Sequence, residues 1–174
     1  MSAAALVMAA SCSKPQKYDV AAYIWPAYHN DPRWAEIGLF PDGKGEWEAI
    51  YNAKPKYEGH RQPRVPLWGY YDESDPKMQE KIISTATKYG VNTFIFDWYW
   101  YDNRPFLEGV LNDGFLKALA DHGATPLDSV GEPFDANYHE ALAQLPSPDV
   151  EEGHVMNEVK RGWLLHGKLL RAAQ

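Results

Sequence analysis

The chain has 174 residues, which is enough for one ordinary domain or two small ones. Its hydrophobic fraction of 45% and charged fraction of 24% are typical of a soluble globular protein. The formal net charge of -7, with no run of Lys or Arg, argues against nucleic acid as a partner, and the single cysteine, Cys12, excludes an internal disulfide framework and a Cys-based zinc site.

Residues 1–17 contain a short apolar run that ends in a small residue and Cys12. This pattern is typical of a bacterial lipoprotein signal, in which the cysteine is lipidated after cleavage, but no Lys or Arg precedes the run. Two hypotheses stay open: a lipoprotein exported through Cys12, or a disordered, Ala-rich terminus. No stretch of the sequence approaches the roughly 20 apolar residues of a membrane-spanning helix.

From residue 18 onwards the pattern changes between strand and helix. The predicted order is a buried strand at 18–25, a long loop at 26–74, a helix at 75–90, a second buried strand at 91–98 and a helix at 105–120. Asp75 can cap the first helix, Pro76 suits its first position, and Gly90 ends it. Both strands are continuous apolar runs, as parallel strands covered on both faces are. This βαβ order predicts an incomplete (β/α) barrel fragment with two parallel strands, because a closed barrel needs eight strands and about 250 residues.

After Gly123 the segments become short. Of the 24 aromatic residues, 19 lie in the first 101 positions, so the composition changes sharply near residues 102–122. Short strands separated by Pro and Gly are expected at 140–145, 155–160, 162–165 and 168–172, which predicts a small all-β module. The expected fold class is therefore α+β overall. The expected parts are a terminus at 1–17, the barrel fragment at 18–118 and the β module at 119–174, with a junction between Gly114 and Gly123.

The segment from Asp97 to Asp102 (DWYWYD) lies where the second parallel strand ends, which is where such folds place their sites. Aromatic rings stack on the apolar faces of sugars, and Asp and His can bond sugar hydroxyls. The candidate glycan-binding residues are Tyr23, Trp25, His29, Asp97, Trp98 and Trp100. The alternative is that these aromatic side chains only fill a core.

Residues 18–118 resemble the start of WbsX-type proteins, which are similar to glycoside hydrolase family 99-like enzymes. The segments that carry this resemblance are residues 22–29 (AYIWPAYH), 45–47 (GEW), 54–64 (KPKYEGHRQPR), 66–71 (PLWGYY) and 94–101 (FIFDWYWY). The resemblance implies a (β/α)₈ barrel that acts on glycans and is often exported. Glycoside hydrolysis needs two carboxyl groups, and those of this class lie on later strands, so Asp97 alone cannot supply both roles. We therefore expect no catalysis and no enzyme.

Residues 119–174 resemble the C-terminal head of GrpE nucleotide-exchange factors. The segments that carry this second resemblance are residues 131–141 (GEPFDANYHEA), 162–163 (GW) and 167–171 (GKLLR). The signature residues are Phe134, Asp135, His139, Ala141, Gly162 and Arg171. The resemblance implies a head that opens the nucleotide cleft of a DnaK-type chaperone, with Lys168 and Val159 in contact with its ATPase domain. Within the signature we expect Phe134 and Ala141 to pack and Gly162 to serve a turn.

Three hypotheses about function remain. The first is a GrpE-like co-chaperone fragment, cytoplasmic, without cofactor or metal. GrpE proteins dimerise through a long helical region, and the short helices at 75–90 and 105–120 have no heptad repeat, so we do not expect a homodimer. The second is a truncated WbsX-type protein that binds an oligosaccharide without its catalytic carboxylates. The third is a non-functional chimera with exposed apolar surface at an open sheet edge.

Overall fold

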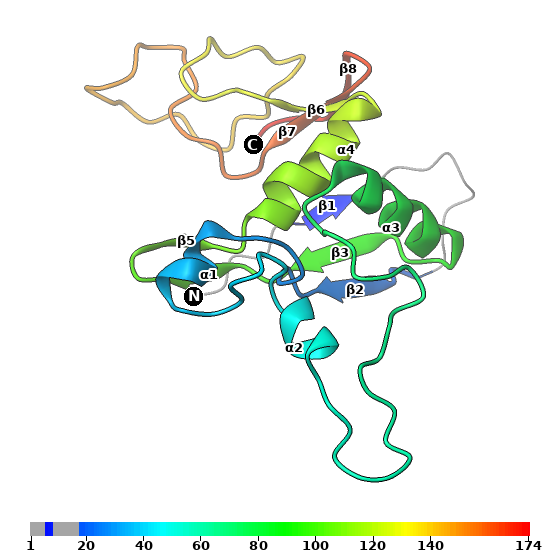
Figure 1. Ribbon diagram of the computed structural model, residues 1–174. Helices are drawn as coiled ribbons and strands as arrows, with labels where there is room; N and C mark the ends of the chain where they lie inside the picture. Colours follow the sequence, from blue (N-terminus) through cyan, green and yellow to red (C-terminus); the bar gives the residue numbers. More distant parts are fainter. Residues whose placement is uncertain (1–5, 9–17) are drawn as a thin grey trace. The chain divides into compact units, whose positions relative to one another are not determined.

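The computed structural model describes residues 6–8 and 18–174 of the chain (Figure 1). Cys12, and with it the predicted lipidation site, lies outside the described residues. The chain divides into two compact units, Met1–Ala118 and Leu119–Gln174, which we call the N-terminal unit and the C-terminal unit. Both mix irregular segments with small sheets, and each is described by itself.

The sheet of the N-terminal unit has three short strands in the order β1-β3-β2. These are β1 (Leu6–Met8), β2 (Ala21–Ile24) and β3 (Thr93–Phe96). The expected parallel pairing of the two later strands is confirmed, in register from Ala21 opposite Thr93 to Ile24 opposite Phe96. The strand β1 was not expected, and it pairs antiparallel with β3. In the described part of the chain this sheet stays open, and no barrel closes.

The prediction that both parallel strands are buried on both faces is right for β3 and wrong for β2. In β3, Phe94 and Phe96 are buried, and both contact the ring of Phe115, at centroid distances of 5.7 and 5.1 Å. In β2, exposed and half-buried residues alternate, and the side chain of Tyr23 is 74% exposed. The difference arises because β2 lies at an edge of the sheet, and apolar composition alone does not distinguish an edge strand from a central one.

Three helices lie between β2 and β3 in the chain. The expected helix after Asp75 is confirmed as α3 (Pro76–Lys88), with the Asp75 carboxylate accepting the Lys77 N–H at 3.0 Å. The predicted loop at 26–74 contains two short helices, α1 (Pro32–Glu36) and α2 (Trp47–Tyr51). The segment between α2 and α3 extends away from the rest of this unit as a long loop (Figure 1).

The helix predicted over 105–120 is wrong in its first part. Residues 99–106 form a hairpin of β4 (Tyr99–Tyr101) and β5 (Arg104–Phe106). The π-helix η1 (Val110–Phe115) and α4 (Leu116–Asp121) follow it. Asp102 and Asn103 have φ of 51° and 56°, which is the backbone of a tight two-residue hairpin turn. The residues on both sides of this turn therefore pair as strands, with Tyr99 opposite Phe106.

The C-terminal unit has a three-stranded antiparallel sheet in the order β6-β7-β8. The strands are β6 (Ala124–Leu127), β7 (Gly162–Leu165) and β8 (Lys168–Arg171), so two of the four predicted strands are confirmed and β6 was not expected. The strands predicted at 140–145 and 155–160 are wrong. Those segments instead form hydrogen bonds with residues 173 and 174. The Glu140 N–H donates to the Ala173 carbonyl at 2.7 Å, and the Val159 N–H donates to the Gln174 carbonyl at 2.6 Å.

Candidate functional site

The aromatic hairpin of the N-terminal unit is held in place by a buried arginine. Arg33, in α1, donates hydrogen bonds to the carbonyls of Tyr101 at 2.8 Å, Arg104 at 3.2 Å and Pro105 at 2.8 Å. Its guanidinium also lies 5.2 Å from the centroid of the Tyr101 ring. A guanidinium presents several donors in a fixed plane, so one side chain satisfies three carbonyls of the hairpin at once.

Asp31 adds a second link between α1 and the segment after the hairpin. One carboxylate oxygen accepts the Arg33 N–H at 2.8 Å and caps α1. The other oxygen accepts the Leu107 N–H at 2.9 Å. Beneath these bonds a small core forms from Ala27, Trp34 and Leu107, with Phe40, Tyr99 and Phe106 packed against it. Neither Asp31 nor Arg33 was singled out from the sequence, where nothing distinguishes them from surface charges.

The structure exposes most of the candidate glycan-binding aromatics and buries the histidine. Trp100 is 64% exposed, Trp25 and Trp98 are also exposed, and the ring of Trp25 meets that of Tyr99 edge-on at 5.4 Å. The Asp97 N–H donates to the Ile24 carbonyl at 3.1 Å, which ties the ends of β2 and β3 together. His29 is only 2% exposed, so it does not lie on the surface where the candidate rim was expected.

Buried polar groups lie beneath this surface. Neither ring nitrogen of His29 makes a hydrogen bond of good geometry among the described residues, and burial lowers the pKa of this histidine. A side chain on Gly109 would bring its Cβ within 2.8 Å of the His29 ring. Burial, together with the nearby Asp72 and Glu46 carboxylates, raises the pKa of Glu73 to about 7, although the Tyr28 N–H lowers it in part.

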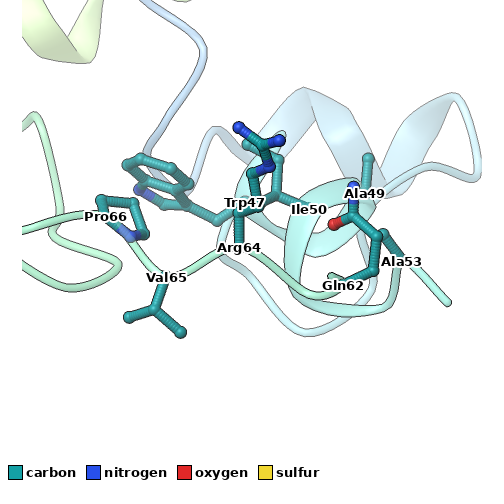
Figure 2. Close-up of a pocket in the computed structure, with 8 residues that line it drawn as sticks. All are labelled: Trp47, Ala49, Ile50, Ala53, Gln62, Arg64, Val65 and Pro66. Atoms are coloured by element: carbon teal, nitrogen blue, oxygen red, sulfur yellow. The ribbon is translucent and has the colours of Figure 1, made fainter. Parts of the chain in front are cut away.

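An open pocket of about 550 Å³ lies between α2 and the long loop that follows it (Figure 2). Its lining is mostly apolar and consists of Trp47, Ala49, Ile50, Ala53, Gln62, Arg64, Val65 and Pro66. A hydrogen bond holds the Trp47 ring in place, because its indole N–H donates to the Tyr71 carbonyl at 2.6 Å. Residues 54–64 carry part of the WbsX resemblance, but nothing in the sequence predicted the pocket beside them.

In the C-terminal unit, residues 135–139 of the GrpE signature form hydrogen bonds with one another. The Asp135 carboxylate accepts the Asn137 N–H at 2.8 Å, and the Asp135 N–H donates to Nδ1 of His139 at 3.0 Å. The His139 N–H donates back to the Asp135 carbonyl at 2.8 Å. Phe134 and Ala141 are exposed, although both were expected to pack; the Phe134 side chain is 44% exposed and its ring lies 5.8 Å from that of His139.

Gly162 allows a close approach and does not serve a turn, which corrects the expectation for this residue. It lies in β7, where an added Cβ would fall 2.8 Å from the Ala173 nitrogen and 3.1 Å from Cβ of Leu127. Arg171 closes the same region, because its guanidinium donates twice to the Arg161 carbonyl, at 3.1 and 2.8 Å. Gly162 thus leaves room for Ala173, and Arg171 links β8 to Arg161, the residue before β7.

The two positions expected to contact a chaperone are both on the surface of the C-terminal unit. Val159 is 75% exposed, and Lys168 is exposed at the start of β8. Within the described part of the chain, the Lys168 ammonium makes no ion pair or hydrogen bond. Leu169 and Leu170, which follow it in β8, are also exposed. This strand thus presents one cation next to two apolar side chains.

Comparison with known proteins divides the chain in two. A family model described as Glycosyltransferase WbsX matches residues 20–121, which is more than half of the chain. The chain belongs to the WbsX family. A second model, GrpE, matches residues 102–174. The chain is thus a two-part chimera of a WbsX part and a GrpE-like part, whose matches overlap at 102–121, and the boundary between the two compact units lies in this overlap.

Individual relatives agree with this division. The WbsX part is 33% identical over 96 residues to the uncharacterized protein WxcX of Xanthomonas campestris pv. campestris, a match that covers 51% of this chain and 13% of that protein. The GrpE-like part is 38% identical over 74 residues to protein GrpE of Stenotrophomonas maltophilia, covering 41% of this chain and 43% of that protein. It is 47% identical over 60 residues to protein GrpE of Syntrophobacter fumaroxidans, a match that covers 34% of this chain and 32% of that protein.

The chain therefore spans about an eighth of WxcX and less than half of these GrpE relatives. The matches support a GrpE-like function, and a WbsX part is present beside it. No solved structure matches the chain. Among the described residues, no helix combines the length and apolarity that crossing a membrane requires, and no group of three or more His, Cys, Asp or Glu side chains is placed to hold a metal ion.

Proposed function

We propose that the GrpE-like part is an adenyl-nucleotide exchange factor for a DnaK-type chaperone. The observation that carries this proposal is the exposure of Val159 and Lys168, the two positions that the GrpE resemblance assigns to chaperone contact. Lys168 has no partner of its own among the described residues, so its charge is free to pair with a carboxylate of the chaperone. The exposed Leu169 and Leu170 add apolar area beside this charge.

In this mechanism the GrpE-like part performs no covalent chemistry. It binds the open state of the chaperone's nucleotide cleft more tightly than the closed, ADP-bound state, and so shifts the population towards the open state. Because such coupling is reciprocal, ADP weakens the association by the same factor by which the association weakens ADP binding. The WbsX part takes no role in nucleotide exchange. It is not proposed to hydrolyse glycans either, since Asp97 alone does not provide the carboxyl pair of a glycosidase.

ADP release from a DnaK-type chaperone loaded with a fluorescent ADP analogue tests the proposal. The intact chain is expected to accelerate release, and Lys168→Ala to weaken its binding roughly fivefold, the effect of losing one contact of about 1 kcal/mol. Lys77→Ala, the same substitution on an exposed residue of α3, is the matched control and should behave as the unsubstituted chain. Failure of a folded chain to accelerate release would contradict the proposal.

The proposal places the chain in the cytoplasm with its chaperone. The alternative, an exported lipoprotein anchored through Cys12, would separate it from such a partner. Metabolic labelling with a fatty-acid analogue distinguishes the two, with Cys12→Ser as the control. Labelling that depends on Cys12 would contradict the cytoplasmic assignment.

A second candidate function, oligosaccharide binding by the WbsX part, is supported by the exposed aromatic surface. Arg33 and Asp31 hold the hairpin that carries Trp100. Sugar stacking needs an exposed ring on a well-held backbone; the Trp100 ring is 64% exposed, and the hairpin backbone that carries it is held by these bonds. Saturable binding of an oligosaccharide, followed by tryptophan fluorescence, should be lost in Trp98→Ala or Trp100→Ala. It should persist in Tyr57→Ala, which removes an exposed ring of the long loop.

A further inference from the structure

Among the described residues, the strand β2 forms an edge of the N-terminal sheet. It pairs with β3 on one side, and Figure 1 shows β3 between it and β1. The carbonyls of Val20 and Ile24 point towards β3, because they accept N–H groups of Thr93 at 3.3 Å and Asp97 at 3.1 Å. Backbone direction alternates along a strand, so the N–H and C=O groups of Ala21 and Tyr23 point away from β3.

These four outward groups have no hydrogen-bond partner among the described residues. Unpaired strand edges attract other strands, and proteins usually protect them with charges, proline or bulges. The segment 20–25 (VAAYIW) has no charged residue, no proline and no glycine, and it pairs with β3 in continuous register. Its side chains are also uncovered: Ala21, Tyr23 and Trp25 are all exposed.

We propose that β2 pairs antiparallel with β2 of a second copy of this chain, about a twofold axis at Ala22. In this register Ala21 of one copy lies opposite Tyr23 of the other, on both sides of the axis. Each such pair exchanges two N–H to C=O hydrogen bonds, so all four outward groups of each copy are satisfied. The symmetric pairing of this one short segment closes at two copies and makes the second copy the fitting occupant.

Charge and side-chain size agree with this register. The Asp19 carboxylates, next to this segment in the sequence, would lie six residues apart along the joined strands. At about 3.3 Å per residue this is roughly 20 Å, well beyond the Debye length of about 8 Å at physiological salt. Each Tyr23 ring lies beside the small Ala21 of the second copy, so the aromatic side chain has room. The net charge of -7 on each copy opposes association, which salt should therefore strengthen.

This dimer is independent of the proposed exchange activity and of any helical dimerisation region. Sedimentation velocity of the intact chain, from low micromolar to several hundred micromolar concentration, is expected to show a monomer–dimer equilibrium that ends at two copies. Ala21→Pro should abolish it, because proline removes an outward N–H that β3 does not use. Unchanged far-UV circular dichroism would establish that this variant keeps its fold.

A charge series tests the register itself. Tyr23→Lys places one cation on each copy, diagonally across the two paired β2 strands, and should weaken dimerisation at least tenfold. The control Tyr57→Lys, on the long loop, should not change dimerisation. Adding Ala21→Glu to Tyr23→Lys places opposite charges in each cross-strand pair and should restore the dimer. A chain that stays monomeric, a dimer that survives Ala21→Pro, growth into larger open-ended species, or a double variant that remains monomeric would each overturn the proposal.

Discussion

Replacement of Glu73 by Gln should remove a pH-dependent instability of the N-terminal unit. Glu73 is 8% exposed, and one of its carboxylate oxygens accepts the Tyr28 N–H at 3.3 Å. Burial, together with the neighbouring Asp72 and Glu46, raises its pKa from 4.5 to about 7. A folded-state pKa above the unfolded one means that the native state binds the proton more tightly. The contribution of Glu73 to stability is therefore fully present below pH 4.5 and is lost as the pH rises through 7.

The size of this loss follows from the two pKa values. At about 1.4 kcal/mol per tenfold change, the interval between 4.5 and about 7 corresponds to about 3 kcal/mol at pH 8. Glutamine is neutral at every pH and keeps a carbonyl oxygen for the Tyr28 N–H. The Glu73→Gln variant should therefore gain up to about 3 kcal/mol over the unsubstituted chain at pH 8, and little at pH 5.

Urea unfolding at pH 5 and pH 8, followed by tryptophan fluorescence, measures this effect. Six of the seven tryptophans lie in the N-terminal unit, so the signal reports on the unit that contains Glu73. The difference between variant and unsubstituted chain isolates Glu73, because His29 and all other titrating groups are common to both. Glu58→Gln, on the exposed long loop, is the matched control. An advantage of Glu73→Gln that is equal at both pH values, or absent at pH 8, would refute the reasoning.

Two further substitutions test the packing of the two units. Arg33→Met should destabilise the N-terminal unit by about 2–4 kcal/mol, because three part-buried hydrogen bonds to hairpin carbonyls are lost. Urea unfolding measures this, and a cost no larger than that of Arg61→Met on the long loop would contradict it. Gly162→Ala should destabilise the C-terminal unit by about 1–3 kcal/mol, because its Cβ would fall 2.8 Å from the Ala173 nitrogen. Differential scanning calorimetry, which follows the unfolding of both units, measures the second effect. An unchanged midpoint of the C-terminal transition would show that Ala173 moves aside without cost.

Features that depend on neighbouring residues in the chain could be predicted from the sequence. The helix α3 begins after Asp75 as expected, because capping by Asp75 and the fixed backbone of Pro76 are local effects. The strands β7 and β8 were also expected, because short apolar runs bounded by turn residues are a local signal; their pairing as a hairpin was not predicted. The turn at Asp102 and Asn103 is equally local, yet the predicted helix from Pro105 was wrong, because the short polar pair that favours a two-residue turn outweighs proline's preference for a helix start.

The division into a WbsX part and a GrpE-like part also follows from the sequence, since short motifs in a fixed order carry each resemblance. The role of each signature residue does not. Asp135 and His139 bond each other across one turn, and Gly162 makes room for Ala173. These contacts join residues up to 11 positions apart, and no local pattern specifies which of them meet.

Burial and pairing at longer range were decided by the tertiary structure alone. The runs of β2 and β3 look alike as sequences, yet β3 is covered and β2 is an exposed edge. In the sequence, Arg33 and Glu73 look like surface charges, yet packing buries both. Hydrogen bonds to three carbonyls compensate the burial of Arg33. The raised pKa of Glu73 reflects the free-energy cost of burying its carboxylate. The physical reason is that solvent exposure depends on which segments distant in the chain come to lie against a residue, and a residue's own neighbours in the sequence do not contain that information.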